Sequence, residues 1–159
     1  LEGSVKTADW EIINLGEMLR HSIEAYRSVN PLRTINLNLP SGSCELRCAP
    51  DLIAQALDKL VDNAISLSAV DCEIDISLRC EESACLINVA NSGTRLPGVL
   101  HDQLFDSLVS LREKRAGGQH LGLGLYIVRL VTEAHGGKVS ARNLPDDNGV
   151  EFTIELPAD

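Results

Sequence analysis

Apolar residues recur at three- and four-residue intervals in residues 15–26, a spacing that is typical of an amphipathic helix. The residues on this face are Leu15, Met18, Leu19, Ile23 and Tyr26. We expect the Asn14 side chain to cap the helix, with Glu17 reaching back to the backbone of the cap. Asn30-Pro31 should end the helix, because the residue before a proline is disfavoured in the helical conformation.

Two further helices are predicted by the same kind of pattern. Residues 51–67 carry the most regular apolar face, formed by Ile53, Leu57, Leu60, Val61 and Ala64. Residues 121–134 form the third predicted helix. His135-Gly136-Gly137 follows it as a C-terminal cap, because glycine readily adopts the left-handed conformation that ends many helices.

Shorter stretches with alternating apolar and polar residues predict strands. Residues 35–39 alternate in this way, and Pro40-Ser41-Gly42 ends the strand. The full set of predicted strands is 10–13, 35–39, 45–48, 73–78, 84–89, 138–142 and 149–156. We expect residues 45–48 to return antiparallel to the strand before them, and the last two strands to form a hairpin.

Three helices grouped with antiparallel strands predict an α+β fold in one domain, residues 1–159, with helices on one face of a mixed sheet. Residues 91–121 are too long for a simple connection, and loops of this length in compact domains usually carry function. We expect a short apolar helix around residues 102–108 inside this segment.

The composition fits a folded domain and excludes several classes of function. Hydrophobic residues make up 44% of the chain but aromatic residues only 3%, so the core must be aliphatic. The 14 basic and 23 acidic residues give a net charge of −9, and no basic cluster of the kind that binds nucleic acid stands out. No apolar run approaches the roughly 20 residues of a membrane helix, and no secretory signal opens the chain. We therefore expect a soluble domain, and a piece of a longer protein because the chain begins with Leu1.

The five cysteines do not predict a metal site. They are Cys44, Cys48, Cys72, Cys80 and Cys85. None of them forms a C-x-x-C pair, and the four histidines are too scattered to complete a zinc site. Most of the cysteines lie in strand-like segments, where a thiol acts as a small apolar side chain. We expect free thiols in a reducing cytoplasmic compartment.

The motif Gly122-Leu123-Gly124-Leu125 opens the third predicted helix. Glycine is disfavoured inside helices, so two glycines in a first turn require a reason. Backbone without side chains can approach a ligand closely, and the unpaired N–H groups of a helix start favour phosphate. The alternative is a tight loop–helix junction in which the glycines serve packing, and the motif alone does not decide between the two.

Two polar features accompany this motif. Lys59, Asn63 and Ser66 lie on a helix face separate from the apolar one, a stripe that by itself is more typical of a solvated face. An apolar strand also ends at Asn91 and Gly93, a pattern that by itself usually marks only a turn.

Together and in this order, the motifs resemble the ATP-binding domain of two-component sensor histidine kinases. The superfamily also contains DNA gyrase, the heat-shock chaperone ATPase and the mismatch-repair ATPases. The resemblance covers residues 57–64 (N box), 91–97 (G1 box), 105–108 (F box), 121–128 (G2 box) and 149–157 (terminal strand). It extends over essentially the whole chain, from about Trp10 to Pro157.

The resemblance implies a Bergerat-type two-layer sandwich that holds ATP between helices, under a lid at about residues 109–121. Asn63 would be the catalytic residue, because its amide oxygen would bind an Mg²⁺ that bridges the phosphates. Asn91 would meet the adenine amino group, and Gly93 would let the base approach. The implied ATP-binding residues are Lys59, Asn63, Asn91, Gly93, Leu96, Phe105, Gly122, Leu123, Gly124 and Leu125.

Several positions depart from the family pattern. Lys59 replaces an N-box asparagine, Ser66 the N-box lysine, Asn91 the G1 aspartate, Arg95 a G1 glycine and His120 a G2 glycine. An amide accepts a weaker hydrogen bond from adenine than a carboxylate does, so Asn91 should weaken ATP binding without abolishing it. Our hypothesis is that Lys59 partly replaces the lysine missing at position 66.

Position 59 also separates two reaction types within the superfamily. Its hydrolase branches place a glutamate there as a general base, which a lysine does not replace at neutral pH. Gyrase-like ATP hydrolysis is therefore disfavoured. In phosphoryl transfer to histidine, the histidine itself is the nucleophile. The ATP-binding domain then mainly has to position the reactants and neutralise charge. Arg112, Lys114 and Arg115 in the lid offer phosphate contacts, although such a charge run is more often solvated.

In this family the phosphate-accepting histidine lies on a separate dimerisation helix pair. His21 lies in the first predicted helix and lacks that setting, so we interpret it as a surface or structural histidine. The resemblance implies a protein histidine kinase that needs the missing domain for activity. Its partners would be that domain, a response regulator and a second copy of a parent protein held in the inner membrane, but not nucleic acid.

Two other functions stay open at this point. The departures from the boxes are also consistent with a degenerate nucleotide-binding or regulatory module that binds ATP weakly or not at all. An anti-sigma-type serine kinase shares the fold and acts on a separate protein.

Overall fold

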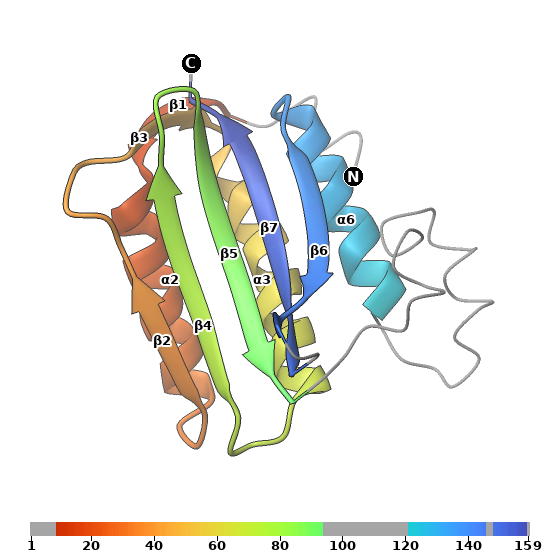
Figure 1. Cartoon of the computed structure of the whole chain (residues 1–159). Coiled ribbons are helices and arrows are strands. Elements are labelled where there is room, and N and C mark those ends of the chain that lie inside the picture. The colour runs from red at the N-terminus through yellow and green to blue at the C-terminus, as the bar shows by residue number, and fades with distance from the viewer. Residues whose placement is uncertain (1–8, 94–120, 146–147, 159) are drawn as a thin grey trace.

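The computed structural model describes residues 9–93, 121–145 and 148–158 of the 159-residue chain. Its elements are β1 (Glu11–Asn14), α2 (Leu15–Val29), β2 (Thr34–Asn38), β3 (Glu45–Cys48), α3 (Pro50–Leu67), β4 (Glu73–Cys80), β5 (Ala84–Ser92), α6 (Leu121–Ala134), β6 (Lys138–Asn143) and β7 (Gly149–Pro157). The three helices cover one face of the main sheet, which gives two layers (Figure 1). The predicted α+β class is confirmed.

The main sheet has five strands in the order β2-β4-β5-β7-β6. β2 runs parallel to β4, and the other neighbours are antiparallel, so the sheet is mixed as predicted. The predicted hairpin of β6 and β7 is confirmed. The predicted pairing of β3 with β2 is wrong. β3 pairs antiparallel with β1 in a separate two-stranded sheet, and β2 pairs with β4. Alternating apolar and polar residues mark a strand but do not specify its neighbour.

Helix α2 begins and ends where the sequence predicts. The Asn14 side chain accepts a hydrogen bond from the Glu17 N–H at 3.2 Å, which confirms the cap. The Glu17 carboxylate does not reach back to the cap but pairs with Arg20, one turn further along the helix, because an opposite charge at this spacing attracts it. The apolar face buries Leu15, Leu19 and Ile23 completely.

The core lies between the helices and the sheet and is largely aliphatic, as the composition requires. Helix α3 contributes its central apolar face, and the sheet contributes the residues of β4, β5 and β7 that point toward it. Fully buried members are Leu57, Leu60, Val61, Ile74, Ile76, Ile87, Val89 and Phe152. Their burial fixes α3 over the middle of the sheet (Figure 1).

Helix α6 lies beside α3 and buries Leu125, Val128 and Val131. Its predicted C-terminal cap is confirmed. Gly136 has φ +75°, and its N–H donates to the Glu133 carbonyl at 2.9 Å. The Gly137 N–H donates to the Thr132 carbonyl at 3.0 Å, which satisfies a further free carbonyl of the helix end.

The expectation of free thiols is wrong for two of the five cysteines. Cys44 and Cys80 are joined by a disulfide between segments 36 residues apart. Cys48, Cys72 and Cys85 are free. The pairing follows from the fold, which brings the segment before β3 to the end of β4, and no local sequence pattern marks it.

Across the part of the chain that the structure describes, no helix combines the length and the apolar character that crossing a bilayer requires.

Candidate functional site

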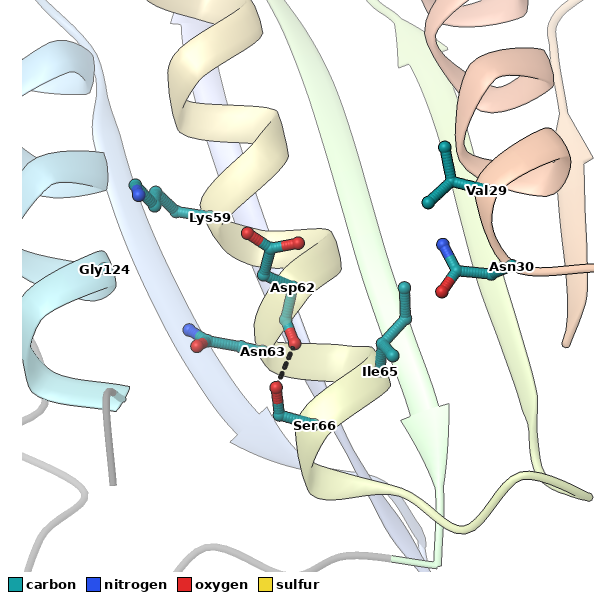
Figure 2. Close-up of a pocket in the computed structure, with 8 residues that line it drawn as sticks. All are labelled: Val29, Asn30, Lys59, Asp62, Asn63, Ile65, Ser66 and Gly124. Carbon is teal, nitrogen blue, oxygen red and sulfur yellow. Dashed lines mark hydrogen bonds between the residues drawn. The ribbon is translucent and has the colours of Figure 1, made fainter. Parts of the chain in front are cut away.

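A pocket of about 460 Å³ lies over the C-terminal half of α3, between the end of α2 and the start of α6 (Figure 2). Three separate parts of the chain form it. The residues that line it are Val29, Asn30, Lys59, Asp62, Asn63, Ile65, Ser66 and Gly124.

Asn63 is the most unusual side chain of this pocket. It is only 7% exposed, and its Nδ2 atom is buried without a hydrogen-bond partner in the described structure. Leaving such a donor unpaired costs about 1–3 kcal/mol. A solvated polar face does not explain this burial, whereas a ligand with acceptor oxygens would satisfy the amide.

Gly124 keeps the space beside Asn63 open. A Cβ atom at this position would lie 3.8 Å from Asn63 Nδ2 and 3.4 Å from Lys59 Cβ. Figure 2 shows Lys59 and Asn63 pointing from α3 toward α6. The described site therefore combines a cation, an unpaired amide donor and the first turn of a helix, three features that favour an anion.

Ser66 lines the same pocket, so the predicted stripe of Lys59, Asn63 and Ser66 is brought together as the spacing requires. The Ser66 hydroxyl donates to the Asp62 backbone carbonyl at 2.7 Å, one turn earlier (Figure 2). This bond occupies the hydroxyl proton, so Ser66 in this rotamer does not supply the donor that a lysine would.

Sequence reasoning missed four residues of the pocket, which are Val29, Asn30, Asp62 and Ile65. Asp62 and Ile65 are neighbours of Asn63 on α3, so helical geometry offered a signal for them. Val29 and Asn30 come from the end of α2, and only the packing of α2 against α3 places them here.

Asn91 lies inside β5 and is 1% exposed, so it is not a turn residue. Its partners across the sheet are Ile74 and Val150, both fully buried. Its Nδ2 donates a long hydrogen bond of 3.4 Å to the Ser92 carbonyl, and its Oδ1 is buried without a partner in the described structure. The Asn91 Oδ1 atom is thus a hydrogen-bond acceptor without a partner in the described structure, among buried apolar residues of the sheet.

Gly93 follows β5 with φ +86°, a conformation that side chains other than glycine's rarely adopt. A Cβ atom there would lie 2.9 Å from Cys72 Sγ. Neither Asn91 nor Gly93 is among the residues that line the pocket over α3.

The remaining predicted residues divide into two groups. Gly122, Leu123 and Leu125 lie in the first turns of α6, and Leu125 is buried in the core. The second group lies outside the described residues. It consists of Arg95, Leu96, Phe105, Arg112, Lys114, Arg115 and His120, together with the short helix predicted at 102–108 and the lid up to residue 120.

Tyr26 links α2 to α3, because its hydroxyl donates a hydrogen bond to the Asp58 carboxylate. Burial, and then the bond to Asp58, raise the pKa of the Tyr26 phenol well above its usual value. The phenol therefore stays protonated and keeps donating at neutral pH. His21, on the same helix, is exposed, in agreement with a surface role.

Residues 48–159 match the family described as histidine kinase-, DNA gyrase B-, and HSP90-like ATPase. The chain belongs to this family. It is an ATP-binding catalytic domain of the sensor histidine kinase type, in agreement with the resemblance of its motifs.

Two of the curated relatives are sensor proteins by name. The chain is 35% identical over 67% of its length to the sensor protein ChvG of Agrobacterium fabrum, and 28% identical over 93% to the sensor histidine kinase ZraS of Klebsiella oxytoca. It spans 19% of the first and 31% of the second, so it corresponds to a minor part of each.

Solved structures share the fold. The catalytic domain of histidine kinase ThkA superposes with a TM-score of 0.80 at 25% identity, over 94% of this chain and 97% of that domain. ThkA in complex with its response regulator TrrA also matches, with a TM-score of 0.78 at 23% identity, over 96% of this chain and 42% of that chain.

Proposed function

We propose that the chain binds ATP in the pocket over α3 and delivers the γ-phosphoryl group to a histidine on a separate dimerisation domain, as the catalytic part of a protein histidine kinase. The observation that carries this proposal is the buried, unpaired Asn63 amide beside the side-chain-free Gly124 at the start of α6. Phosphoryl transfer mainly requires positioning and charge neutralisation, and this arrangement supplies groups for both.

The triphosphate would lie between α3 and the first turn of α6. Asn63 Nδ2 would donate to a phosphate oxygen, and the N–H groups at Gly122 and Gly124 would do the same from the helix start. Lys59 would add a positive charge from α3, in place of the lysine that Ser66 replaces. Leu125, which is buried in the core, would fix this turn against the protein.

Mg²⁺ would be held mainly by phosphate oxygens and water, with Asn63 as its ligand from the protein. Within residues 9–93, 121–145 and 148–158, no three His, Cys, Asp or Glu side chains form a group that could hold a metal ion. This composition fits a cation that arrives with the nucleotide. When bound, Mg²⁺ neutralises phosphate charge.

Asn91 and Gly93 would receive the adenine base, with Leu96 and Phe105 contributing from the segment after β5. The buried Oδ1 of Asn91 is an acceptor without a partner in the described structure, and the adenine amino group is a donor. The two groups are chemically complementary. Because the acceptor is neutral, its bond should be weaker than that of a carboxylate.

The proposed reaction needs partners beyond these residues. We propose that the acceptor histidine lies on a dimerisation domain of the parent protein, that a response regulator receives the phosphoryl group, and that the parent is a homodimer. The relation of ThkA to TrrA supports the second of these. We further propose that residues 1–159 form a single domain with a lid at about 109–121, on the cytoplasmic side of a parent anchored in the inner membrane.

Calorimetric titration with Mg·ADP and Mg·AMPPNP tests the binding part of this proposal. We expect binding to the unmodified chain and at least a tenfold loss in Asn63→Ala, about 1.4 kcal/mol. Asn38→Ala is the matched control, because Asn38 is exposed on β2, outside the residues that line the pocket. No binding by the unmodified chain at millimolar nucleotide would refute the proposal and favour a regulatory module.

Transfer of labelled γ-phosphate tests the reaction. The chain is mixed with the helix pair of its parent, with the acceptor histidine intact or replaced by glutamine. Label on the intact helix pair alone is expected. Label on serine, or free phosphate released as fast without any acceptor, would contradict histidine kinase activity.

A further inference from the structure

Three cysteine sulfurs meet at the end of the sheet that lies away from the pocket over α3. Cys44 precedes β3, Cys80 ends β4, and Cys85 lies near the start of β5. Cys44 and Cys80 are joined, and the Cys85 sulfur lies 3.4 Å from the Cys80 sulfur. Figure 1 shows this end, where the turn between β4 and β5 lies beside β1 and β3.

The strand register makes Cys85 a second possible partner for Cys80. The two residues are directly opposite each other on β4 and β5. The Glu81 N–H donates to the Ala84 carbonyl at 2.8 Å, so Cys80 and Cys85 form the next, non-hydrogen-bonded pair. Cα atoms in such pairs lie about 4.5 Å apart, within the range that a disulfide spans. The present bond joins Cα atoms 6.2 Å apart, also within that range.

We propose that this cluster is a thiol–disulfide exchange site, in which Cys85 displaces Cys44 from Cys80. The Cys85 thiolate attacks Cys80 Sγ, the Cys80–Cys85 bond forms, and the Cys44–Cys80 bond breaks. Cys44 leaves as a thiolate and takes up the proton that Cys85 has lost, so the step requires no external oxidant or reductant.

The exchange moves the free thiol to a different environment. Cys85 and Cys44 are both buried, 2% and 4% exposed, but Cys44 also lines an open pocket of about 300 Å³ between the start of α2 and the segment before β3. After exchange the free thiol therefore belongs to a residue that lines this pocket, whereas before exchange it belongs to one that does not.

The exchange also releases a tether. The Cys44 carbonyl accepts the Leu15 N–H at 2.8 Å, so this residue connects the first turn of α2 to the disulfide. After exchange, that turn and the segment before β3 are no longer linked covalently to β4. Burial raises the pKa of the Cys85 thiol, so little thiolate is present at neutral pH and the exchange should take minutes to hours.

Disulfide mapping tests this proposal on the whole chain. The oxidised protein is incubated without added thiol at about pH 8, quenched with acid and alkylated in denaturant. Trypsin then releases residues 34–47, with Cys44, and residues 80–95, with both Cys80 and Cys85. We expect alkylated Cys44 and an internal disulfide in 80–95 to increase together over hours.

Two variants make the result decisive. Cys85→Ser should keep 34–47 linked to 80–95 throughout, and the matched control Cys48→Ser, a buried free thiol outside the cluster, should behave like the unmodified chain. Cys44→Ser in a buffer of oxidised glutathione should form the Cys80–Cys85 bond. The proposal is overturned if Cys85 alone is alkylated at every time point, or if folded Cys44→Ser keeps both of its remaining cluster thiols free.

Discussion

His135 Nε2 accepts a hydrogen bond from the Ala49 N–H at 3.1 Å. Ala49 lies at the start of α3, a helix without a side-chain cap, and His135 directly follows α6. The other ring nitrogen, Nδ1, lies 2.8 Å from the Val131 carbonyl and donates to it in the neutral tautomer. The Trp10 ring packs against the imidazole at 4.5 Å between centroids. The neutral imidazole thus links the start of α3 to the end of α6, the two helices that carry Lys59, Asn63 and Gly124.

Acid should destabilise the fold through this histidine. Burial lowers the pKa of His135, a shift that its bond to Val131 only partly opposes. Above the ordinary pKa of 6.5 both the folded and the unfolded chain carry a neutral ring, and its contribution to stability is fully present. As the pH falls below 6.5 the unfolded chain binds the proton first, so the free energy of unfolding should decrease until the folded ring is protonated too.

Urea unfolding between about pH 8 and pH 5, followed by the fluorescence of the single tryptophan Trp10, measures this decrease. His135→Gln should make the free energy of unfolding depend less on pH in the range below 6.5. The matched control is His21→Gln, because His21 is exposed on α2. An unchanged slope in His135→Gln would show that other groups carry the effect.

Gly124→Ala should separate stability from nucleotide binding. A helical alanine is favoured over glycine by about 0.5–1 kcal/mol, and the new Cβ would make only ordinary contact with Lys59 at 3.4 Å. The melting temperature without ligand should therefore rise. The added methyl group would occupy space beside Asn63, so the further rise caused by Mg·ADP should shrink. Ser28→Ala, exposed on α2, is a control that should leave the ligand effect intact.

Lys59→Ala should weaken the binding of ATP, by about tenfold, much more than that of adenosine. The reason is that Lys59 would contact the phosphates and not the base. Titration of both ligands at two salt concentrations measures how much affinity each one loses. The loss for ATP should become closer to the loss for adenosine at high salt, because salt screens the attraction between Lys59 and the phosphates. Lys138→Ala, exposed at the start of β6, is the matched control. An equal loss for both ligands would place Lys59 in a general structural role instead.

Tyr26 should resist ionisation until the protein unfolds. Its folded pKa is raised above the ordinary 10.0, so the stability it contributes is present below that pH and lost as the pH rises further. In Tyr126→Phe, Tyr26 is the single remaining tyrosine, and tyrosinate absorbance should then appear together with the loss of helical circular dichroism. Absorbance that appears in the folded protein would contradict the bond to Asp58.

Regular periodicity located the helices well because it depends on short-range geometry. The predicted helix at 51–67 differs from α3 by one residue at its start, and the one at 121–134 agrees with α6. Asn63 and Gly124 were both singled out from the sequence, one from a polar stripe and one from a glycine motif. That they face each other followed only from the family resemblance, because periodicity does not reveal which helices are neighbours.

The errors concern partners and not elements. Residues 45–48 form a strand as predicted, but they pair with β1 in a separate sheet, and β2 pairs with β4 instead. Alternation shows which face of a strand is apolar, and it does not identify the neighbouring strand. The disulfide between Cys44 and Cys80 was missed for the same reason, since it depends on where β3 lies.

The sulfur of Cys72 packs against Gly93, just past the buried acceptor of Asn91. Cys72 is half-buried, while the other two free thiols, Cys48 and Cys85, are buried. A fluorophore that reacts with thiols under native conditions should therefore attach selectively at this one place. If a purine base binds beside Asn91, the emission of this fluorophore should change. The labelled chain would then report purine binding optically, without any substitution in its sequence.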